Sequence, residues 1–332
     1  MKKTWLGLSL GLVAVMLAVL ATGCATVTNT ANPASPPSGT TTIAVGSGGS
    51  ATLTANAKTG AASIVVMDQL QNPITSTNNL NIKNITIDIW STTTTTQTAV
   101  VDTITYSGGS AAQAISYAMT LDRSGSMSSD SNASLESAAV AFINQSGATD
   151  QGAIFNFDSY VVMDQALTTD KDLLKVAATM ESISGGSTAL YDSIGFAILT
   201  VEAGANARKA VIAMTDGGEN NSVTYNTTGE VVTLALAKSI PVYTVGLGLT
   251  AGGADENNLK GIATGSGGFY YYAPTATDIV ALYSKVASAL NSSWTVNFTS
   301  PVTFVTSTTY YVKITVTYDG GITNSVTFTV TV

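Results

Sequence analysis

The sequence predicts an α/β domain built on a doubly wound, mostly parallel sheet, flanked on both sides by segments that form a β-sandwich. Between residues 114 and 290, apolar runs of strand length alternate with longer segments whose apolar residues recur at helical spacing, which is typical of a parallel sheet covered by helices. In residues 50–113 and 291–332, short apolar groups of strand length recur, several of them alternating with polar residues. This pattern indicates strands with one buried face.

The amino terminus predicts export. Residues 1–23 carry a short basic start, an apolar run and small residues at the end, which is typical of a secretory signal peptide. The end of this segment, Ala21 to Cys24, resembles a bacterial lipobox and implies that Cys24 carries a lipid anchor. Two alternatives are an uncleaved membrane anchor and an ordinary exported protein with a free thiol. Cys24 is the only cysteine of the chain, so it forms no internal disulfide.

A tether and two β-rich flanks are predicted next. Residues 24–49 are rich in Thr, Ser, Asn, Pro and Gly, as expected of a flexible tether. Strands are predicted at residues 63–67, 82–90, 99–106, 294–298, 310–318 and 325–332. The C-terminal flank offers little apolar material for an independent core. We therefore expect both flanks to pack on each other with residues 114–290 inserted between them, or else to form a separate small domain at each end.

The central segment contains the parts of the doubly wound sheet. Strands are predicted at residues 115–122, 153–157, 210–214, 242–246 and 269–272, with a short edge strand at 160–163. Helical stripes are predicted from the following apolar residues: Leu135, Ala138, Ala139, Phe142 and Ile143; Leu173, Val176, Ala177 and Met180; Leu190, Ile194, Ala197, Ile198 and Val201; Ile279, Leu282, Tyr283, Val286, Ala287 and Leu290.

Oxygen-bearing side chains follow the predicted strands. The run 115–122 ends on Asp122, and Ser124 and Ser126 come directly after it; a second strand is followed by Asp216, and Thr188 precedes a predicted helix. Ligands of open α/β sheets gather at the carboxyl ends of the strands, so these five residues are expected at one rim. Hydroxyls, carboxylates and water suit Mg²⁺, a hard cation that prefers octahedral oxygen coordination. The alternative is that Asp122 to Ser126 form only a turn.

Three motifs together resemble the von Willebrand factor type A family and its metal-ion-dependent adhesion site. They are Asp-x-Ser-x-Ser at 122–126, Gly-Gly-Ser-Thr-Ala-Leu-Tyr-Asp at 185–192 and Thr-Asp-Gly at 215–217. The resemblance implies a Rossmann-like domain. It also implies that Ser124, Ser126 and Thr188 bind Mg²⁺ (or Mn²⁺ or Ca²⁺) directly, and that Asp122 and Asp216 bind it through water.

The amino-acid composition excludes some classes of function. The chain has 13 basic and 21 acidic residues, a net charge of −8 and no histidine, which excludes His-dependent catalysis and makes nucleic acid an unexpected partner. We expect a lipoprotein of the bacterial cell envelope, at the outer membrane or cell surface, that is not an enzyme. Its metal site would bind an Asp or Glu carboxylate of a partner protein. The alternatives are a magnesium-dependent hydrolase and a structural envelope or filament component with a stabilising metal.

Overall fold

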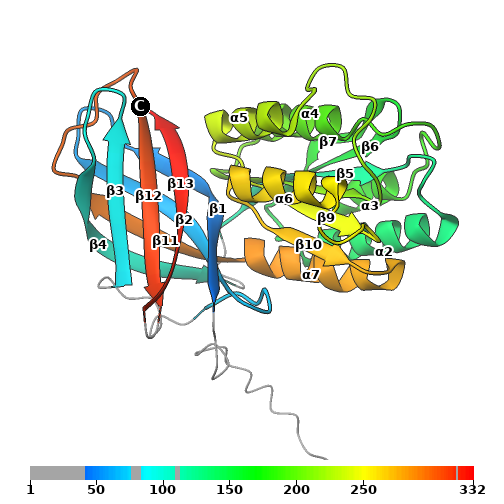
Figure 1. Cartoon of the computed structure of the whole chain (residues 1–332), viewed down its shortest axis with the longest axis horizontal. Coiled ribbons are helices and arrows are strands. Elements are labelled where there is room, and N and C mark those ends of the chain that lie inside the picture. Colours follow the sequence, from blue (N-terminus) through cyan, green and yellow to red (C-terminus); the bar gives the residue numbers. More distant parts are fainter. Residues whose placement is uncertain (1–41, 76–83, 109–112, 319–320) are drawn as a thin grey trace, which may run out of the picture. The chain divides into compact units, whose positions relative to one another are not determined.

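The computed structural model describes residues 42–75, 84–108, 113–318 and 321–332, and its strands form two sheets (Figure 1). The predicted signal peptide 1–23 and Cys24 lie outside the described residues. Within the described part of the chain, no helix is long and apolar enough to cross a membrane.

The central domain contains the predicted doubly wound sheet. Its six strands follow the order β10-β9-β8-β5-β6-β7, and all neighbours are parallel except β6 and β7. The strands are β5 (Ile115–Asp122), β6 (Gln151–Phe157), β7 (Val161–Thr168), β8 (Arg208–Thr215), β9 (Val242–Leu247) and β10 (Tyr270–Ala273). Every residue of β5 is buried, as expected of a strand covered on both faces.

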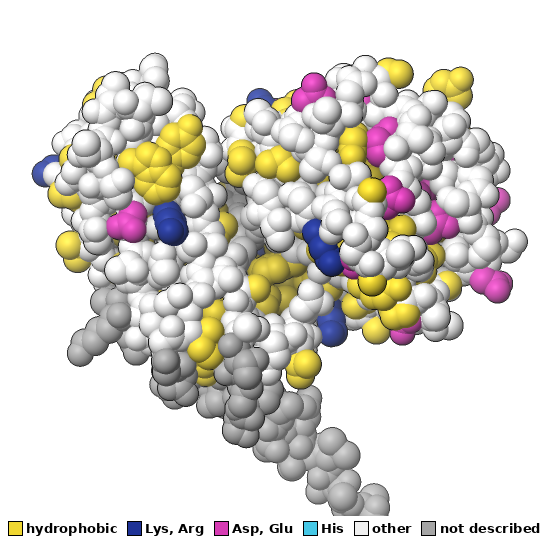
Figure 2. Space-filling view, in the orientation of Figure 1, with side chains coloured by type: hydrophobic (Ala, Val, Ile, Leu, Met, Phe, Trp, Pro, Cys, Tyr) yellow, Lys and Arg dark blue, Asp and Glu magenta, His cyan; other side chains and the backbone are white. Residues whose placement is uncertain are grey.

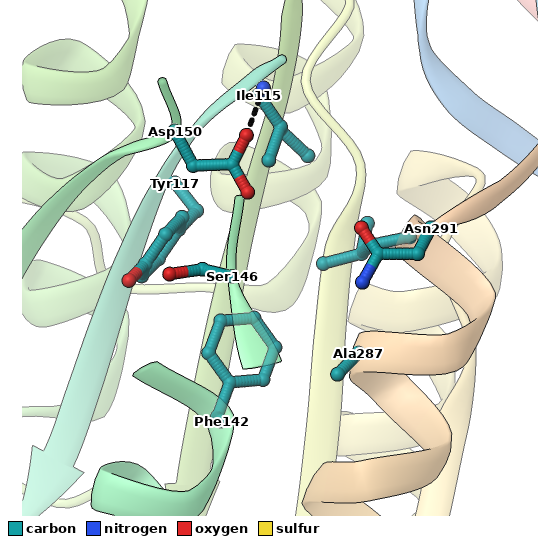
Figure 3. Close-up of a pocket in the computed structure, with 8 residues that line it drawn as sticks. Ile115, Tyr117, Phe142, Ser146, Asp150, Ala287 and Asn291 are labelled. Atoms are coloured by element: carbon teal, nitrogen blue, oxygen red, sulfur yellow. Dashed lines mark hydrogen bonds between the residues drawn. The ribbon is translucent and has the colours of Figure 1, made fainter. Parts of the chain in front are cut away.

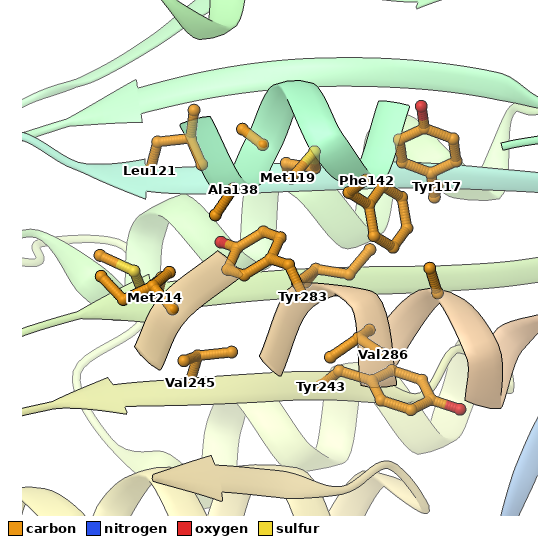
Figure 4. Close-up of a cluster of buried hydrophobic side chains, with 14 of the residues drawn as sticks. Tyr117, Met119, Leu121, Ala138, Phe142, Met214, Tyr243, Val245, Tyr283 and Val286 are labelled. Atoms are coloured by element: carbon orange, nitrogen blue, oxygen red, sulfur yellow. The ribbon is translucent and has the colours of Figure 1, made fainter. Parts of the chain in front are cut away.

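Helices cover both faces of this sheet and enclose two apolar cores (Figure 1). One face carries α2 (Ser129–Gln145), α3 (Lys171–Ala178) and α7 (Ile279–Leu290); the other carries α4 (Leu190–Glu202), α5 (Thr228–Lys238) and α6 (Ala254–Ser266). Figure 4 shows the first core, in which Phe142 of α2 and Tyr283 of α7 meet side chains of β5, β8 and β9. A short helix, η3 (Ala276–Asp278), begins with the capping box between Thr275 and Asp278 and leads into α7.

One helix is predicted with the wrong buried face, and two helices have no predicted counterpart. The stripe predicted for α3 has the wrong phase, because Leu173, Val176 and Met180 are 49%, 59% and 45% exposed while Leu174 is 1% exposed. Helices α5 and α6 were not predicted at all. They are rich in Thr, Gly and Ala and bury few large side chains, so their apolar periodicity is weak.

The flanks form one antiparallel sheet rather than the predicted β-sandwich. The order is β1-β2-β11-β4-β3-β12-β13, so β11 of the C-terminal flank lies between two strands of the N-terminal flank, and both flanks build one sheet. The edge strands β1 and β13 contact each other, and the sheet curls around a single apolar core. The strands are β1 (Ile43–Leu53), β2 (Thr59–Asp68), β3 (Ile85–Ser91), β4 (Gln97–Gly108), β11 (Ser292–Thr299), β12 (Thr309–Tyr318) and β13 (Ile322–Thr331). Alternating burial predicts one buried face but not what covers it.

The predicted tether 24–49 extends too far, because residues 43–49 belong to β1. The remainder of that tether, up to residue 41, lies outside the described residues. The small residues of β1 reflect close packing: a Cβ on Gly46 would lie 2.7 Å from the Phe269 ring and 2.8 Å from the carbonyl oxygen of Gly267. The Gly and Ser residues that this packing requires are also typical of linkers, so composition alone predicts a tether here.

Arg208, at the start of β8, connects the two sheets. Its side chain is buried, and Nε donates to the carbonyl of Gly48 at 2.8 Å while Nη1 donates to that of Gln113 at 3.0 Å. Nη2 donates to the carbonyl of Leu290 at the end of α7. One guanidinium thus joins β1, the segment before β5 and the last helix.

Candidate metal centre

Asp122 ends β5 and is completely buried. Its Oδ1 accepts the backbone N–H of Ser124 at 2.7 Å, and its Oδ2 accepts the hydroxyl of Thr215 at 2.5 Å. Because Thr215 is the last residue of β8, the bond joins the carboxyl ends of two neighbouring parallel strands. The carboxylate is therefore held at the rim where the sequence predicts it.

A chain of oxygen contacts leads from Ser124 to Asp216. The hydroxyls of Ser124 and Ser126 lie 3.1 Å apart, and the Ser126 hydroxyl donates to Asp216 Oδ1 at 2.5 Å. Adjacent ligands of an octahedral Mg²⁺ with bonds near 2.1 Å stand about 3.0 Å apart, which is close to the spacing of the two hydroxyls. A hydroxyl that gives its proton to a carboxylate keeps lone pairs for a cation. These residues therefore fit an oxygen-liganded divalent ion.

Backbone hydrogen bonds connect the loop that contains Thr188 to the loop that contains Ser124 and Ser126. Gly125 N–H donates to the carbonyl of Gly186 at 3.1 Å, and Gly185 N–H donates to the carbonyl of Arg123 at 2.8 Å. Gly185 and Gly186 have φ of 90° and 80°, a conformation that favours glycine. Among the residues that the structure describes, the Thr188 hydroxyl has no hydrogen-bond partner, so its side chain is the one candidate ligand not bonded to the others.

The family follows from the sequence of this domain. Residues 118–285 match the model of the von Willebrand factor type A domain. The chain belongs to this family. No curated protein matches the chain.

Several solved structures are similar to this chain at low sequence identity. Proximal thread matrix protein 1 from the mussel byssus has 17% identity and a TM-score of 0.50, over 57% of this chain and 49% of that chain. The VWF domain of the type V pili tip protein Mfa5 from Porphyromonas gingivalis has 12% identity and a TM-score of 0.46, over 54% and 96%. A von Willebrand factor type A protein from Catenulispora acidiphila has 10% identity and a TM-score of 0.46, over 87% and 72%.

Arg123 is a residue of the VWA site that sequence reasoning missed. It lies inside the Asp-x-Ser-x-Ser motif but is 1% exposed. Its guanidinium donates to Asn156 at 2.9 Å, to Glu136 at 2.8 Å and to the carbonyl of Ala178 at 3.0 Å. The loop that carries Ser124 and Ser126 is thereby anchored to β6, α2 and the end of α3. The partners lie far apart in the sequence, so no local pattern reveals them.

Asp192 positions a neighbouring loop of the VWA domain. It is 4% exposed, and its carboxylate accepts the backbone N–H groups of Val223, Thr224 and Tyr225 at 2.9, 2.9 and 2.8 Å. This loop continues from Asp216 and returns to α5. Asp192 therefore supports the rim by holding the backbone of the loop that follows Asp216.

Burial raises the pKa of both rim carboxylates, Asp122 and Asp216. It raises the pKa of Asp122 to about 6, against the opposing effect of hydrogen bonds from Thr215 and Ser124, and the charge of Asp216 raises it further. Burial also raises the pKa of Asp216. A nearby cation would favour the charged forms. Among the described residues, no group of three or more His, Cys, Asp or Glu is placed to hold a metal ion.

Two cavities lie near β5. A polar groove of about 400 Å³ opens beside Ser124 and Gly125, with Asn132, Glu136 and Ser184 on its walls. A second cavity of about 10 Å³ lies at the other end of β5, between Tyr117, Asp150 and Asn291 (Figure 3). It has room for about one water molecule and for no larger ligand.

Proposed function

We propose that the VWA domain binds a partner protein through a divalent cation, Mg²⁺ or else Mn²⁺ or Ca²⁺. Ser124, Ser126 and Thr188 would contact the ion directly, and Asp122 and Asp216 would hold it through water. The observation that supports this most strongly is the unbroken series of contacts from Ser124 to Ser126 to Asp216, at 3.1 and 2.5 Å. If Asp122 to Ser126 formed only a turn, their side chains would bond to nearby backbone groups, and a contact with Asp216 on a separate loop would not be expected.

The ligand set favours binding over catalysis. Neutral hydroxyls leave a bound cation most of its charge, so it attracts an Asp or Glu carboxylate brought by a partner protein. The domain offers no histidine as a general base, and Asp122 and Asp216 are engaged with Thr215 and Ser126. We therefore assign no reaction to the site. A screen for phosphoester and peptide hydrolysis with and without Mg²⁺ tests this, and metal-dependent turnover would contradict it.

Metal binding is tested by thermal unfolding with and without Mg²⁺, Mn²⁺ and Ca²⁺. An ion at about 100 times its Kd should stabilise the fold by about 2.7 kcal/mol. Ser126→Ala and Asp216→Asn should abolish this gain, whereas Asp172→Asn should retain it because the Asp172 side chain is 90% exposed on α3. Equal stabilisation of all variants would show that the ions act elsewhere.

Partner binding needs a separate measurement. Envelope proteins captured by the immobilised wild-type domain should elute on chelation and should be absent from the Asp216→Asn column. If metal stabilises the fold but no capture depends on it, the cation has a structural role instead.

We further propose that the protein is exported and anchored to the bacterial cell envelope through a lipid on Cys24. Support comes from the basic start, apolar run and lipobox-like end of residues 1–24. Mass spectrometry of the mature N-terminus should find a diacylglyceryl group on Cys24. Cys24→Ser should release the protein from membranes, and retention of that variant in the membrane fraction would refute the lipid anchor.

A further inference from the structure

A pair of aromatic side chains lies on the outer face of the seven-stranded sheet. Trp90 on β3 pairs directly with Tyr311 on β12, and their rings are stacked with centroids 5.6 Å apart and planes at 20°. Both alternate with buried neighbours, Ile89 and Val312, so they point away from the core. Figure 2 shows a hydrophobic patch over β3 and β12, with one basic and one acidic side chain beside it.

The pair is not needed to fill the core. The inner face beneath it is already occupied by Ile87, Ile89 and Val312, which are 0%, 0% and 1% exposed. Within the described part of the chain, neither the Trp90 indole N–H nor the Tyr311 hydroxyl has a hydrogen-bond partner. The pair therefore offers apolar ring surface together with two free hydrogen-bonding groups.

The polar side chains that surround the two rings carry no net charge as a group. Asp88 and Lys313 form the next pair on the same face of the sheet. Asp88 accepts the Thr98 hydroxyl at 2.9 Å, while Lys313 makes no hydrogen bond or ion pair with any described residue. Across β12, the position of Tyr311 is paired with Thr329. One acid, one base and hydroxyls give a neutral face that can donate and accept hydrogen bonds.

A groove continues from this face. It has a volume of about 560 Å³. Tyr311 and β13 residues that include Asn324, Thr327 and Thr329 form one wall, and residues of β1, α5 and α6 with Phe269 complete the lining, which is apolar in large part. This volume is within the range of about 300–1,000 Å³ found for small-molecule sites. Tyr311 therefore belongs both to the aromatic pair and to the lining of this groove.

We propose that this face binds a neutral oligosaccharide. The C–H faces of sugar rings are apolar and pack on Trp90 and Tyr311, while sugar hydroxyls pair with Lys313, Asp88 and the amide and hydroxyl groups of the groove. A nucleic acid would need a basic surface, and a protein partner would need a larger apolar centre than two rings. The site is separate from the metal centre and independent of the cation.

The test uses cellotetraose, chitotetraose and maltotetraose as probes, with the full chain in chelator, by calorimetry and tryptophan fluorescence. At least one probe should bind the wild type. Trp90→Ala and Tyr311→Ala should each weaken binding by about tenfold or more, as removal of a central aromatic contact does. Tyr311→Phe, which keeps the ring, should lose less.

Val100→Ala is the matched control, because Val100 is 66% exposed on the same outer face and lies outside the proposed site. It should bind as the wild type does. Should an aromatic variant unfold, Lys313→Ala serves in its place, since it removes from the site an ammonium that bonds to no described residue; it too should weaken binding. The proposal is overturned if no probe binds at millimolar concentration, or if loss of the rings or of Lys313 leaves binding unchanged.

Discussion

Replacing Arg208 by Met should destabilise the protein strongly, because the guanidinium satisfies carbonyls that water cannot reach. Of its three acceptors, Gly48 and Leu290 are buried and Gln113 is exposed, so the substitution leaves two buried carbonyls unpaired. Each unpaired buried group costs about 1–3 kcal/mol, or about 2–6 kcal/mol together. Removing a buried charge returns part of this, since burial lowers the pKa of Arg208 and thus opposes its charged form. We expect a net loss of about 2–4 kcal/mol.

Urea unfolding followed by circular dichroism measures this loss. Lys209→Met is the matched control: its ammonium also donates to three backbone carbonyls, those of Val201, Glu202 and Gly204 at the end of α4, but Lys209 is partly exposed. A cation at a helix C-terminus contributes about 0.3–1 kcal/mol. If Arg208→Met costs no more than Lys209→Met, the guanidinium is not the connection between the sheets that its contacts indicate.

Three further predictions concern packing and charge. Gly46→Ala should cost about 1–3 kcal/mol by overpacking against Phe269, and a thermal melt equal to the wild type would contradict this. Leu174→Ala should cost about 2–5 kcal/mol while Leu173→Ala changes stability by less than about 0.5 kcal/mol, and similar losses in urea would refute the helix phase. Hydrogen bonds hold the pKa of Glu256 below its ordinary value of 4.5, so its stabilisation is present above that pH and is lost as pH falls. Glu256→Gln should therefore flatten the acid side of the stability–pH curve, and an unchanged slope would count against it.

The rim can be predicted from the sequence because each segment that contributes to it is recognisable by a local pattern. Asp122 and Asp216 each follow an apolar run of strand length, and parallel strands deliver their carboxyl ends to one edge of the sheet. The hydrogen bond from Thr215 to Asp122 bears out this convergence. Which oxygens would contact a metal stays a prediction, and it rests on the family resemblance.

Small and polar residues account for what the sequence did not reveal. The sequence predicts a tether over part of β1 because the strand's close approach to Phe269 and to Lys209 requires glycines, at Gly46 and Gly49. The sandwich prediction is wrong for a different reason. Buried and exposed residues alternate along β12, and the same alternation is expected whether the buried face packs on a second sheet or on other strands of the same curled sheet, as it does here. Pairing partners in such a sheet are long-range and leave no mark in a single strand.

The two arginines of the chain illustrate the same limit and suggest how to see past it. All other basic residues are lysines, yet Arg123 and Arg208 are each 1% exposed. Only a planar guanidinium can donate in several fixed directions at once, which suits a buried connection between segments, whereas an ammonium suits a hydrated surface. Arg123 fixes the loop that follows β5, and Arg208 fixes the start of β8 to β1 and α7. In a chain whose other cations are lysines, an arginine next to an apolar strand is therefore itself a signal of a buried network, although its partners can be named only from the structure.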